Sequence, residues 1–125
     1  IIMHAQLCNT SFLLMPVGNE GGSVNLFDHI LYETQQTKEE NIRKMYLEIV
    51  KIVKFCHENY IILRHMQLKR YEFYDDSRSL IRLADPFNIC VCPVGNDLIG
   101  ERNACPNYVA PEIFKKKEAY SGTKA

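Results

Sequence analysis

The amino-acid sequence predicts an α+β fold, and three observations lead to that expectation. Apolar residues recur at helical spacing over residues 37–59, and short runs typical of strands flank this segment on both sides. The 125 residues are 46% apolar and 24% charged, which is the composition of an ordinary globular domain. Fifteen basic and fifteen acidic residues give a formal net charge of zero, so charge implies neither a nucleic acid nor an anionic membrane as a partner.

The beginning of the chain predicts two strands. Residues 2–7 and 12–15 are apolar or mixed runs, and the stretch 8–11 between them is suited to a tight turn. Pro16 is expected to end the second strand. Residues 16–23 hold three glycines without the G-x-G-x-x-G pattern of a phosphate-binding loop, so they predict an extended linker or hinge.

Two helices are expected after this linker. Asn25 is placed to cap the first helix, with Asp28 three positions further on. The apolar stripe of this helix is predicted to comprise Leu26, Phe27, Ile30 and Leu31. Thr37 and Glu40 have the spacing of a capping box, which opens the long helix, and Asn59 is expected to adopt the left-handed conformation that ends it.

The remainder of the chain predicts small strands on a helical base. Residues 61–63, 71–74 and 80–83 have the texture of short strands joined by polar turns. Residues 85–107 contain three prolines and two glycines and predict a long loop, which in a compact domain is usually functional. Pro111 is expected to open a short helix that ends in a lysine-rich turn.

Three short motifs, in this order, resemble those of a protein kinase domain. Residues 63–67 read Leu-Arg-His-Met-Gln where kinases have the H-R-D-L-K catalytic loop, and residues 83–87 read Leu-Ala-Asp-Pro-Phe at the D-F-G position. Ala110, Pro111 and Glu112 match the A-P-E motif that closes the kinase activation segment. This last match is the most specific of the three.

The resemblance implies a protein kinase-like fold of the α+β class, of which this chain is a fragment. In that fold, residues 1–15 are the last strands of the N-lobe, 16–23 the hinge, and 24–125 the first half of the mainly helical C-lobe. The C-lobe part includes the catalytic-loop region 61–74 and the activation segment 85–112. The glycine-rich nucleotide loop and its strand lysine precede these elements in a kinase, so ATP affinity is not readable from this stretch.

Three further stretches make the chain most similar to the Tribbles pseudokinases. These stretches are residues 68–73, 104–109 and 120–122. Like Tribbles proteins, the chain carries Leu63 in place of the catalytic-loop histidine. Tribbles proteins usually keep the catalytic-loop aspartate and lose the D-F-G aspartate, whereas this chain has His65 at the first position and keeps Asp85 at the second. The resemblance therefore implies a divergent relative.

The three positions that carry kinase chemistry hold the wrong residues for phosphoryl transfer. The reaction needs a carboxylate base, a lysine on the transferred phosphoryl group and an asparagine ligand for magnesium, and the chain has His65, Gln67 and Arg70 there. Losing the base costs about 10² to 10⁴ in rate, and losing the lysine costs about 10² to 10³. Arg70 both deletes a metal ligand and repels the metal ion. We therefore expect a degenerate kinase without catalytic activity.

Asp85 is a kinase metal ligand that the sequence retains. It is either a residual contact to magnesium or ATP or an incidental loop carboxylate, and neither alternative makes a cofactor a requirement. Cys90, Cys92, Cys105 and His57 lack the paired spacing of a zinc site, so no metal centre is predicted. The five cysteines are odd in number and irregular in spacing, which indicates reduced thiols and a location in the cytoplasm or nucleus.

The activation segment lacks residues that a kinase could phosphorylate. Between Asp85 and Asn107 the sequence contains no Ser, Thr or Tyr. In kinases an arginine at the Arg64 position waits for a loop phosphate, and the segment offers it none. By the resemblance, Leu63 and Arg64 have structural roles, as do Ala110, Pro111 and Glu112 at the end of the segment.

The resemblance implies a pseudokinase that acts as a protein-binding adaptor. Tribbles relatives hold substrates such as bZIP transcription factors, recruit an E3 ubiquitin ligase and bind MAP-kinase kinases. Asp97 and Arg102 in the loop are expected to contribute to partner binding, and no nucleic acid or membrane partner is expected. The alternatives are a weakly active or unorthodox Ser/Thr kinase that uses His65 and Asp85 with residual ATP binding, and a nucleotide-sensing or purely structural lobe.

The resemblance also implies that the apolar face of the long helix packs on a later helix of the C-lobe. In these 125 residues the face is therefore expected to lose its main cover. Its residues are Ile49, Ile52, Val53 and Cys56. Glu112 is likewise expected to lack its arginine partner, so the isolated stretch is predicted to be unfolded, molten or prone to aggregate.

Overall fold

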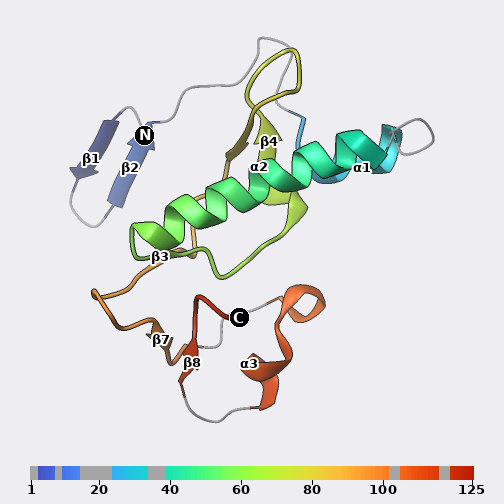
Figure 1. Cartoon of the computed structure of the whole chain (residues 1–125). Helices are drawn as coiled ribbons and strands as arrows, with labels where there is room; N and C mark the ends of the chain where they lie inside the picture. The colour runs from blue at the N-terminus through green and yellow to red at the C-terminus, as the bar shows by residue number, and fades with distance from the viewer. Residues whose placement is uncertain (1–2, 8–9, 15–23, 34–38, 102–104, 116–118) are drawn as a thin grey trace.

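The computed structural model of the chain describes residues 3–7, 10–14, 24–33, 39–101, 105–115 and 119–125. The helices among them are α1 (Leu26–Glu33), α2 (Glu39–Glu58) and α3 (Pro111–Lys115), with 3-10 turns at Leu68–Arg70 and Pro106–Tyr108. The described strands form four antiparallel pairs. Figure 1 shows α2 crossing the middle of the molecule, with α1 beside its first turns and α3 below it. This mixture of helices and short strands is the predicted α+β class.

The first pair of strands is a hairpin. β1 (Met3–Leu7) and β2 (Thr10–Leu14) pair in antiparallel register from Met3 opposite Leu14 to Leu7 opposite Thr10. The two predicted strands are confirmed, but the predicted four-residue turn is wrong because its second half already belongs to β2. The predicted hinge, residues 16–23, lies outside the described residues.

α1 begins at the predicted cap. The Asp28 backbone N–H donates to Asn25 Oδ1 at 2.9 Å, and Asn25 Nδ2 donates to Asp28 Oδ2 at 2.6 Å. These bonds satisfy a backbone donor that a helix N-terminus otherwise leaves free. Leu26 is fully buried as predicted. Leu31 is 57% exposed, so its assignment to the buried stripe is wrong.

α2 ends at Glu58, one residue before the position that the sequence suggested. Asn59 Nδ2 donates to the Phe55 carbonyl at 2.8 Å, so this side chain satisfies a free carbonyl in the last turn. The left-handed residue is Tyr60, with a φ of 59°, and the prediction that Asn59 would take that conformation is wrong. The predicted capping residue Thr37 lies outside the described residues.

The first hydrophobic core lies between α1, α2 and the hairpin of β4 (Tyr71–Phe73) and β5 (Ile81–Leu83). Its buried residues are Leu26, Met45, Tyr71, Phe73 and Ile81. Ile49 and Ile52 of α2 pack against this cluster, and Cys56 is buried too. The expectation that this face of α2 lacks cover is therefore wrong for these three residues, because Ile49 and Ile52 pack on the cluster at the β4–β5 hairpin and Cys56 is buried.

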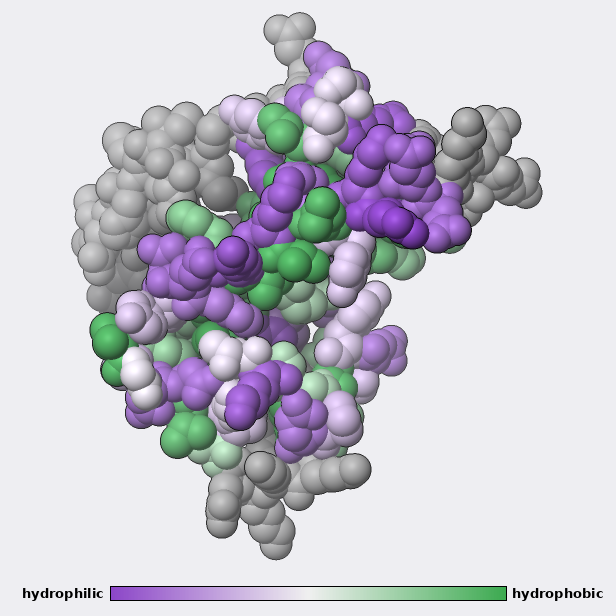
Figure 2. All heavy atoms as spheres, viewed as in Figure 1, coloured by the Kyte–Doolittle hydropathy of each residue, from purple (hydrophilic) through white to green (hydrophobic). Residues whose placement is uncertain are grey.

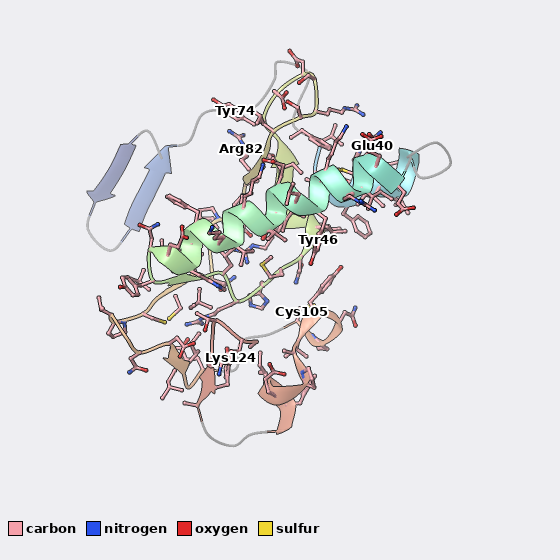
Figure 3. All side chains as sticks on the ribbon, viewed as in Figure 1. Glu40, Tyr46, Tyr74, Arg82, Cys105 and Lys124 are labelled. Atoms are coloured by element: carbon pink, nitrogen blue, oxygen red, sulfur yellow. The ribbon has the colours of Figure 1, made fainter. Side chains whose placement is uncertain are left out.

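The β4–β5 hairpin also carries a charged pair. Glu72 is buried and lies opposite Arg82 across the two strands, and Arg82 Nε donates to Glu72 Oε1 at 2.6 Å. The Arg82 guanidinium carbon lies 5.2 Å from the centroid of the Tyr74 ring, at the hairpin end labelled in Figure 3. Asp75 then accepts hydrogen bonds from the turn that joins the strands, and these bonds hold its pKa below the usual range. The hairpin is thus fixed at its strands and at its turn.

The predicted long loop is not a single loop. β6 (Cys90–Val91) pairs with β3 (Ile61–Ile62), and β7 (Leu98–Ile99) pairs with β8 (Tyr120–Ser121). These pairs build a second hydrophobic core around Ile62, Cys92, Ile99, Ile113 and Tyr120. The expectation of one long loop at 85–107 is wrong, because two short strands interrupt it and pair with residues far away in the sequence.

Part of the apolar surface of α2 remains exposed. Ile42, Tyr46 and Val50, spaced four residues apart, are 43%, 67% and 41% exposed. Figure 2 shows apolar residues reaching the surface among polar ones on the face that α2 crosses. Of the helices in the described part of the chain, none has the length and apolar composition needed to span a membrane.

Candidate functional site

The β4–β5 pairing brings the kinase-like positions together. Because Tyr71 lies opposite Leu83, the residues just outside the ladder also meet, and the Ala84 N–H donates to the Arg70 carbonyl at 2.8 Å. Asp85 follows directly. The end of the catalytic-loop region is thereby held beside the residue at the D-F-G position.

Arg70 is the centre of this site. Its side chain is buried, and all five guanidinium N–H donors reach backbone carbonyls. Nη1 donates to Leu63 and His65 at 3.2 and 2.7 Å, Nε and Nη2 donate to Asp85 at 3.1 and 2.6 Å, and Nη2 also donates to Phe87 at 2.5 Å. One side chain therefore fastens the catalytic-loop region to the D-F-G region.

The charge of Arg70 is compensated mainly by carbonyl dipoles. Its closest carboxylate is that of Asp85, with Oδ2 3.7 Å from Arg70 Nε. A buried cation is tolerated when its donors are satisfied, and here every donor is. The resemblance assigns this position to a magnesium ligand, but a guanidinium offers no lone pair and adds a positive charge. The residues present therefore do not fit a kinase magnesium site.

Asp85 is turned toward its own loop. The Phe87 backbone N–H donates to Asp85 Oδ1 at 2.9 Å, which closes a turn of the Asx type. The side chain is 47% exposed. Among the residues that the structure describes, no group of three or more His, Cys, Asp or Glu side chains is arranged to hold a metal ion.

His65 and Gln67 contribute to the site through their backbones. The His65 N–H donates to the Leu63 carbonyl at 2.6 Å, and the Gln67 carbonyl accepts the Arg70 N–H at 2.9 Å, which starts the 3-10 turn. Both side chains are half-buried. The structure thus brings the predicted residues His65, Gln67, Arg70 and Asp85 into one region, but Arg70 dominates their contacts.

Arg64 has a partner that the sequence analysis missed. Its Nη1 donates to Glu101 Oε2 at 2.9 Å, and the Glu101 carbonyl accepts the Tyr120 hydroxyl at 3.3 Å. Arg64 has a φ of 57°, an uncommon backbone conformation that bulky residues adopt only at a cost. The neighbouring Cys90 side chain, and after it Glu101, raise the pKa of Arg64. Glu101 lies within the predicted activation segment, and its negative charge is the feature of the sequence that could have indicated it as a partner for Arg64.

Of the two residues expected to contribute to partner binding, the structure describes Asp97 but not Arg102. Arg102 lies outside the described residues. Asp97 Oδ2 accepts hydrogen bonds from the Ser121 hydroxyl at 2.5 Å and from the Thr123 N–H and hydroxyl, and these bonds lower the pKa of Asp97 to about 2. The partner-binding role of Asp97 stays a prediction, and in the structure its carboxylate is bonded to Ser121 and Thr123.

The remaining motif residues differ in burial, and their structural roles stay predictions. Leu63 is 2% exposed. Pro111 opens α3 as predicted, and Ala110 packs against the second core while its carbonyl accepts the Ile113 N–H at 3.0 Å. Glu112 is half-buried, and within the described residues it has no ion pair.

Comparison with known proteins identifies Tribbles relatives. The chain is 28% identical over 123 residues to Tribbles of Drosophila melanogaster, which covers 93% of this chain and 25% of that protein. It is 29% identical over 91 residues to Tribbles homolog 1 of Homo sapiens, covering 73% of this chain and 24% of that protein. Tribbles homolog 3 of Bos taurus is 26% identical over 115 residues, which covers 92% of this chain and 30% of that protein.

These relatives imply a kinase-like fold for the described helices and strands. The chain spans about a quarter to a third of the length of the curated relatives it matches. No protein-family model matches it. The similarity nevertheless extends over most of the chain and agrees with the three kinase-like motifs, so the chain is a Tribbles-like, kinase-related sequence.

Proposed function

We propose that this chain is the degenerate catalytic region of a Tribbles-like pseudokinase, which binds proteins instead of phosphorylating them. One observation carries the proposal. The Arg70 guanidinium is bonded through all its donors to the two segments that would hold magnesium and phosphate in a kinase. Arg70 therefore occupies the position of a magnesium ligand without a lone pair to offer a metal ion.

Electrostatics support the same conclusion. A divalent ion bound to Asp85 would lie within about 6 Å of Arg70, and at an effective dielectric constant of about 20 the repulsion is about 5 kcal/mol. The residues at the base and lysine positions, His65 and Gln67, supply neither a carboxylate nor a cation. Because a kinase needs base, lysine and metal together, the loss of all three is incompatible with ordinary phosphoryl transfer.

A domain that cannot transfer a phosphoryl group can still bind other proteins. By resemblance to Tribbles proteins, the proposed partners are substrate proteins such as transcription factors, an E3 ubiquitin ligase and MAP-kinase kinases. No cofactor is required by this role, and the proposed location is the cytoplasm or nucleus. The exposed apolar residues on α2 show that large hydrophobic side chains are present on the described surface.

The test is a kinase assay on the full-length protein with generic peptide substrates, combined with thermal unfolding in ATP with and without magnesium. We expect no phosphorylation and no magnesium-dependent rise in Tm, since a ligand that binds only the folded state raises stability. The variant His65→Asp/Gln67→Lys/Arg70→Asn, which restores the three kinase residues, is the comparison for magnesium binding.

The alternative function predicts a different result. Magnesium-dependent phosphorylation by the unmodified protein that disappears in His65→Ala or Asp85→Ala would establish an unorthodox Ser/Thr kinase and overturn the proposal. A nucleotide-dependent rise in Tm without phosphorylation would instead indicate a nucleotide-sensing lobe.

A further inference from the structure

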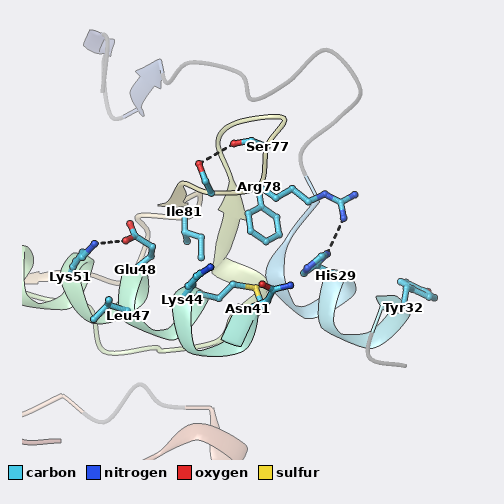
Figure 4. Close-up of a pocket in the computed structure, with 13 residues that line it drawn as sticks. His29, Tyr32, Asn41, Lys44, Leu47, Glu48, Lys51, Ser77, Arg78 and Ile81 are labelled. Atoms are coloured by element: carbon cyan, nitrogen blue, oxygen red, sulfur yellow. Dashed lines mark hydrogen bonds and ion pairs between the residues drawn. The ribbon is translucent and has the colours of Figure 1, made fainter. Parts of the chain in front are cut away.

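A large cavity lies away from the Arg70 site. It has a volume of about 1020 Å³ and opens between α1, α2 and the turn of the β4–β5 hairpin (Figure 4). None of the residues at 63–70 or 85–87 lines it. Its size is at the upper end of the range of small-molecule pockets, and it is open to solvent, which suits a segment of polypeptide better than a compact ligand.

The floor of the cavity is apolar. Met45, Phe73 and Ile81 line it and are each less than a tenth exposed. His29 packs edge-on to Phe73, with ring centroids 4.9 Å apart and an angle of 85° between the planes. Such a floor is suited to a large apolar side chain, because removing apolar surface from water stabilises a complex.

The walls of the cavity carry an excess of positive charge. Lys44, Lys51 and Arg78 line it against one carboxylate, Glu48, although the chain as a whole has no net charge. Lys51 Nζ lies 2.5 Å from Glu48 Oε1, and Lys44 Nζ lies 2.9 Å from Glu40 Oε1 just outside the cavity. These lysines are largely exposed, so their ion pairs are weak and leave the ammonium groups open to further contacts.

Arg78 reaches into the cavity from the hairpin turn. Its Nη1 lies 3.3 Å from His29 Nδ1, and Figure 4 shows the side chain extending from the turn toward α1. The nearby carboxylate of Asp75 does not line the cavity and accepts hydrogen bonds from the Ser77 and Ser79 hydroxyl groups. Cationic groups therefore approach the apolar floor from both α2 and the hairpin turn.

We propose that this cavity docks a short acidic peptide segment of a partner protein, with one large apolar side chain on the floor and flanking carboxylates on Lys44, Lys51 and Arg78. The inference rests on the proposed protein-binding function. Lys44 and Lys51 are two turns apart on α2, about 10 Å, which is the length of about three residues of an extended peptide. Carboxylates a few residues apart in the partner would therefore reach both.

The probe is a displayed library of randomised short peptides, selected on the full-length protein. We expect enriched peptides to combine acidic residues with an aromatic or large aliphatic residue, and their affinity to fall as salt rises. A synthetic peptide of the enriched sequence, labelled for fluorescence anisotropy, then measures Kd. Enrichment of basic or uncharged peptides, or no enrichment, would overturn the proposal.

The variants are matched in charge and position. Lys44→Gln/Lys51→Gln removes two cavity cations, and Arg43→Gln/Lys54→Gln removes two cations from the same helix that do not line the cavity. All four side chains are more than half exposed and form ion pairs within α2. We expect the first variant to weaken peptide binding about tenfold and the second to change it less than twofold.

The two proposals fail in different ways. Equal affinity of both double variants for the enriched peptide would show that the peptide binds elsewhere, and would leave the pseudokinase proposal untouched. Phosphorylation activity of the unmodified protein would overturn the pseudokinase proposal, whereas the difference between the double variants would still stand as evidence for the docking site.

Discussion

The guanidinium of Arg70 donates two hydrogen bonds to the backbone carbonyl of Asp85, through Nε at 3.1 Å and Nη2 at 2.6 Å. Arg70 stands where a kinase has a magnesium ligand, and in this structure it connects the catalytic-loop region to the D-F-G region. The contact is made to the backbone, so its strength does not depend on which side chain residue 85 carries.

Arg70→Ala should destabilise the full-length protein strongly. Hydrogen bonds to charged groups contribute about 1.5 to 3 kcal/mol each, and several carbonyls lose their donor at once, so we expect a loss of at least about 3 kcal/mol. Arg43→Ala, on the exposed face of α2, should cost less than about 0.5 kcal/mol. Urea unfolding measures both, and equal effects of the two substitutions would contradict the structural role of Arg70.

Gly122→Ala should be destabilising because there is no room for a methyl group. A Cβ at Gly122 would lie 2.6 Å from Ile99 Cδ1 and 3.0 Å from Ile62 Cγ2. Overpacking of this kind costs about 1 to 3 kcal/mol. At Gly100 a Cβ meets nothing within 4 Å, so Gly100→Ala should be neutral or slightly stabilising. Thermal unfolding of the two variants is the measurement, and a Tm unchanged in Gly122→Ala would show that the second core is looser than described.

Asp97 should make stability depend on pH at the acidic end. Its pKa is lowered to about 2 by the Ser121 hydroxyl first and by Thr123 next, so the folded state binds its proton less readily than the unfolded state. The stabilisation is present above about pH 4, the unfolded value, and is lost as the pH falls through about 2. NMR titration of the Asp97 carboxyl group tests this directly. The double variant Ser121→Ala/Thr123→Ala should return the pKa toward its ordinary value, and an unchanged titration would contradict the assignment.

Leu26→Ala should cost about 2 to 5 kcal/mol, because a fully buried side chain in the first core would be replaced by a cavity. The matched control is Leu31→Ala on the same helix, where the leucine is 57% exposed and the expected change is below about 0.5 kcal/mol. If the two substitutions had similar effects in urea unfolding, α1 would not pack on the hairpin as described.

The sequence predicted those features that depend on neighbouring residues. The Asn25 cap, the long amphipathic helix and the β4–β5 hairpin all have signals within a few positions of the chain. The β7–β8 pair could not be predicted, because each strand has two residues and their partners lie more than 20 positions apart. The left-handed residue was misplaced by one position, since Asn59 used its side chain to cap the helix and left the conformational change to Tyr60.

The site was predicted in its residues but not in its contacts. The sequence placed His65, Gln67, Arg70 and Asp85 in the region of kinase chemistry, and the structure does bring them near one another. That the charge of Arg70 opposes a metal ion stays a prediction. Its bonding to four carbonyls could not be predicted, because it depends on how two distant segments fold. Glu101 was missed for the same reason, because the approach of Arg64 to it is created by the chain between them.

The Arg64–Glu101 ion pair joins two charges that the sequence itself supplies. In a kinase the partner of this arginine is a phosphate that one enzyme adds and another removes, and the segment changes state as it comes and goes. Glu101 supplies a negative charge that is encoded in the gene and that no phosphatase can take away. Arg64 therefore has a partner charge in every copy of the chain, and this contact does not wait for the addition of a phosphate.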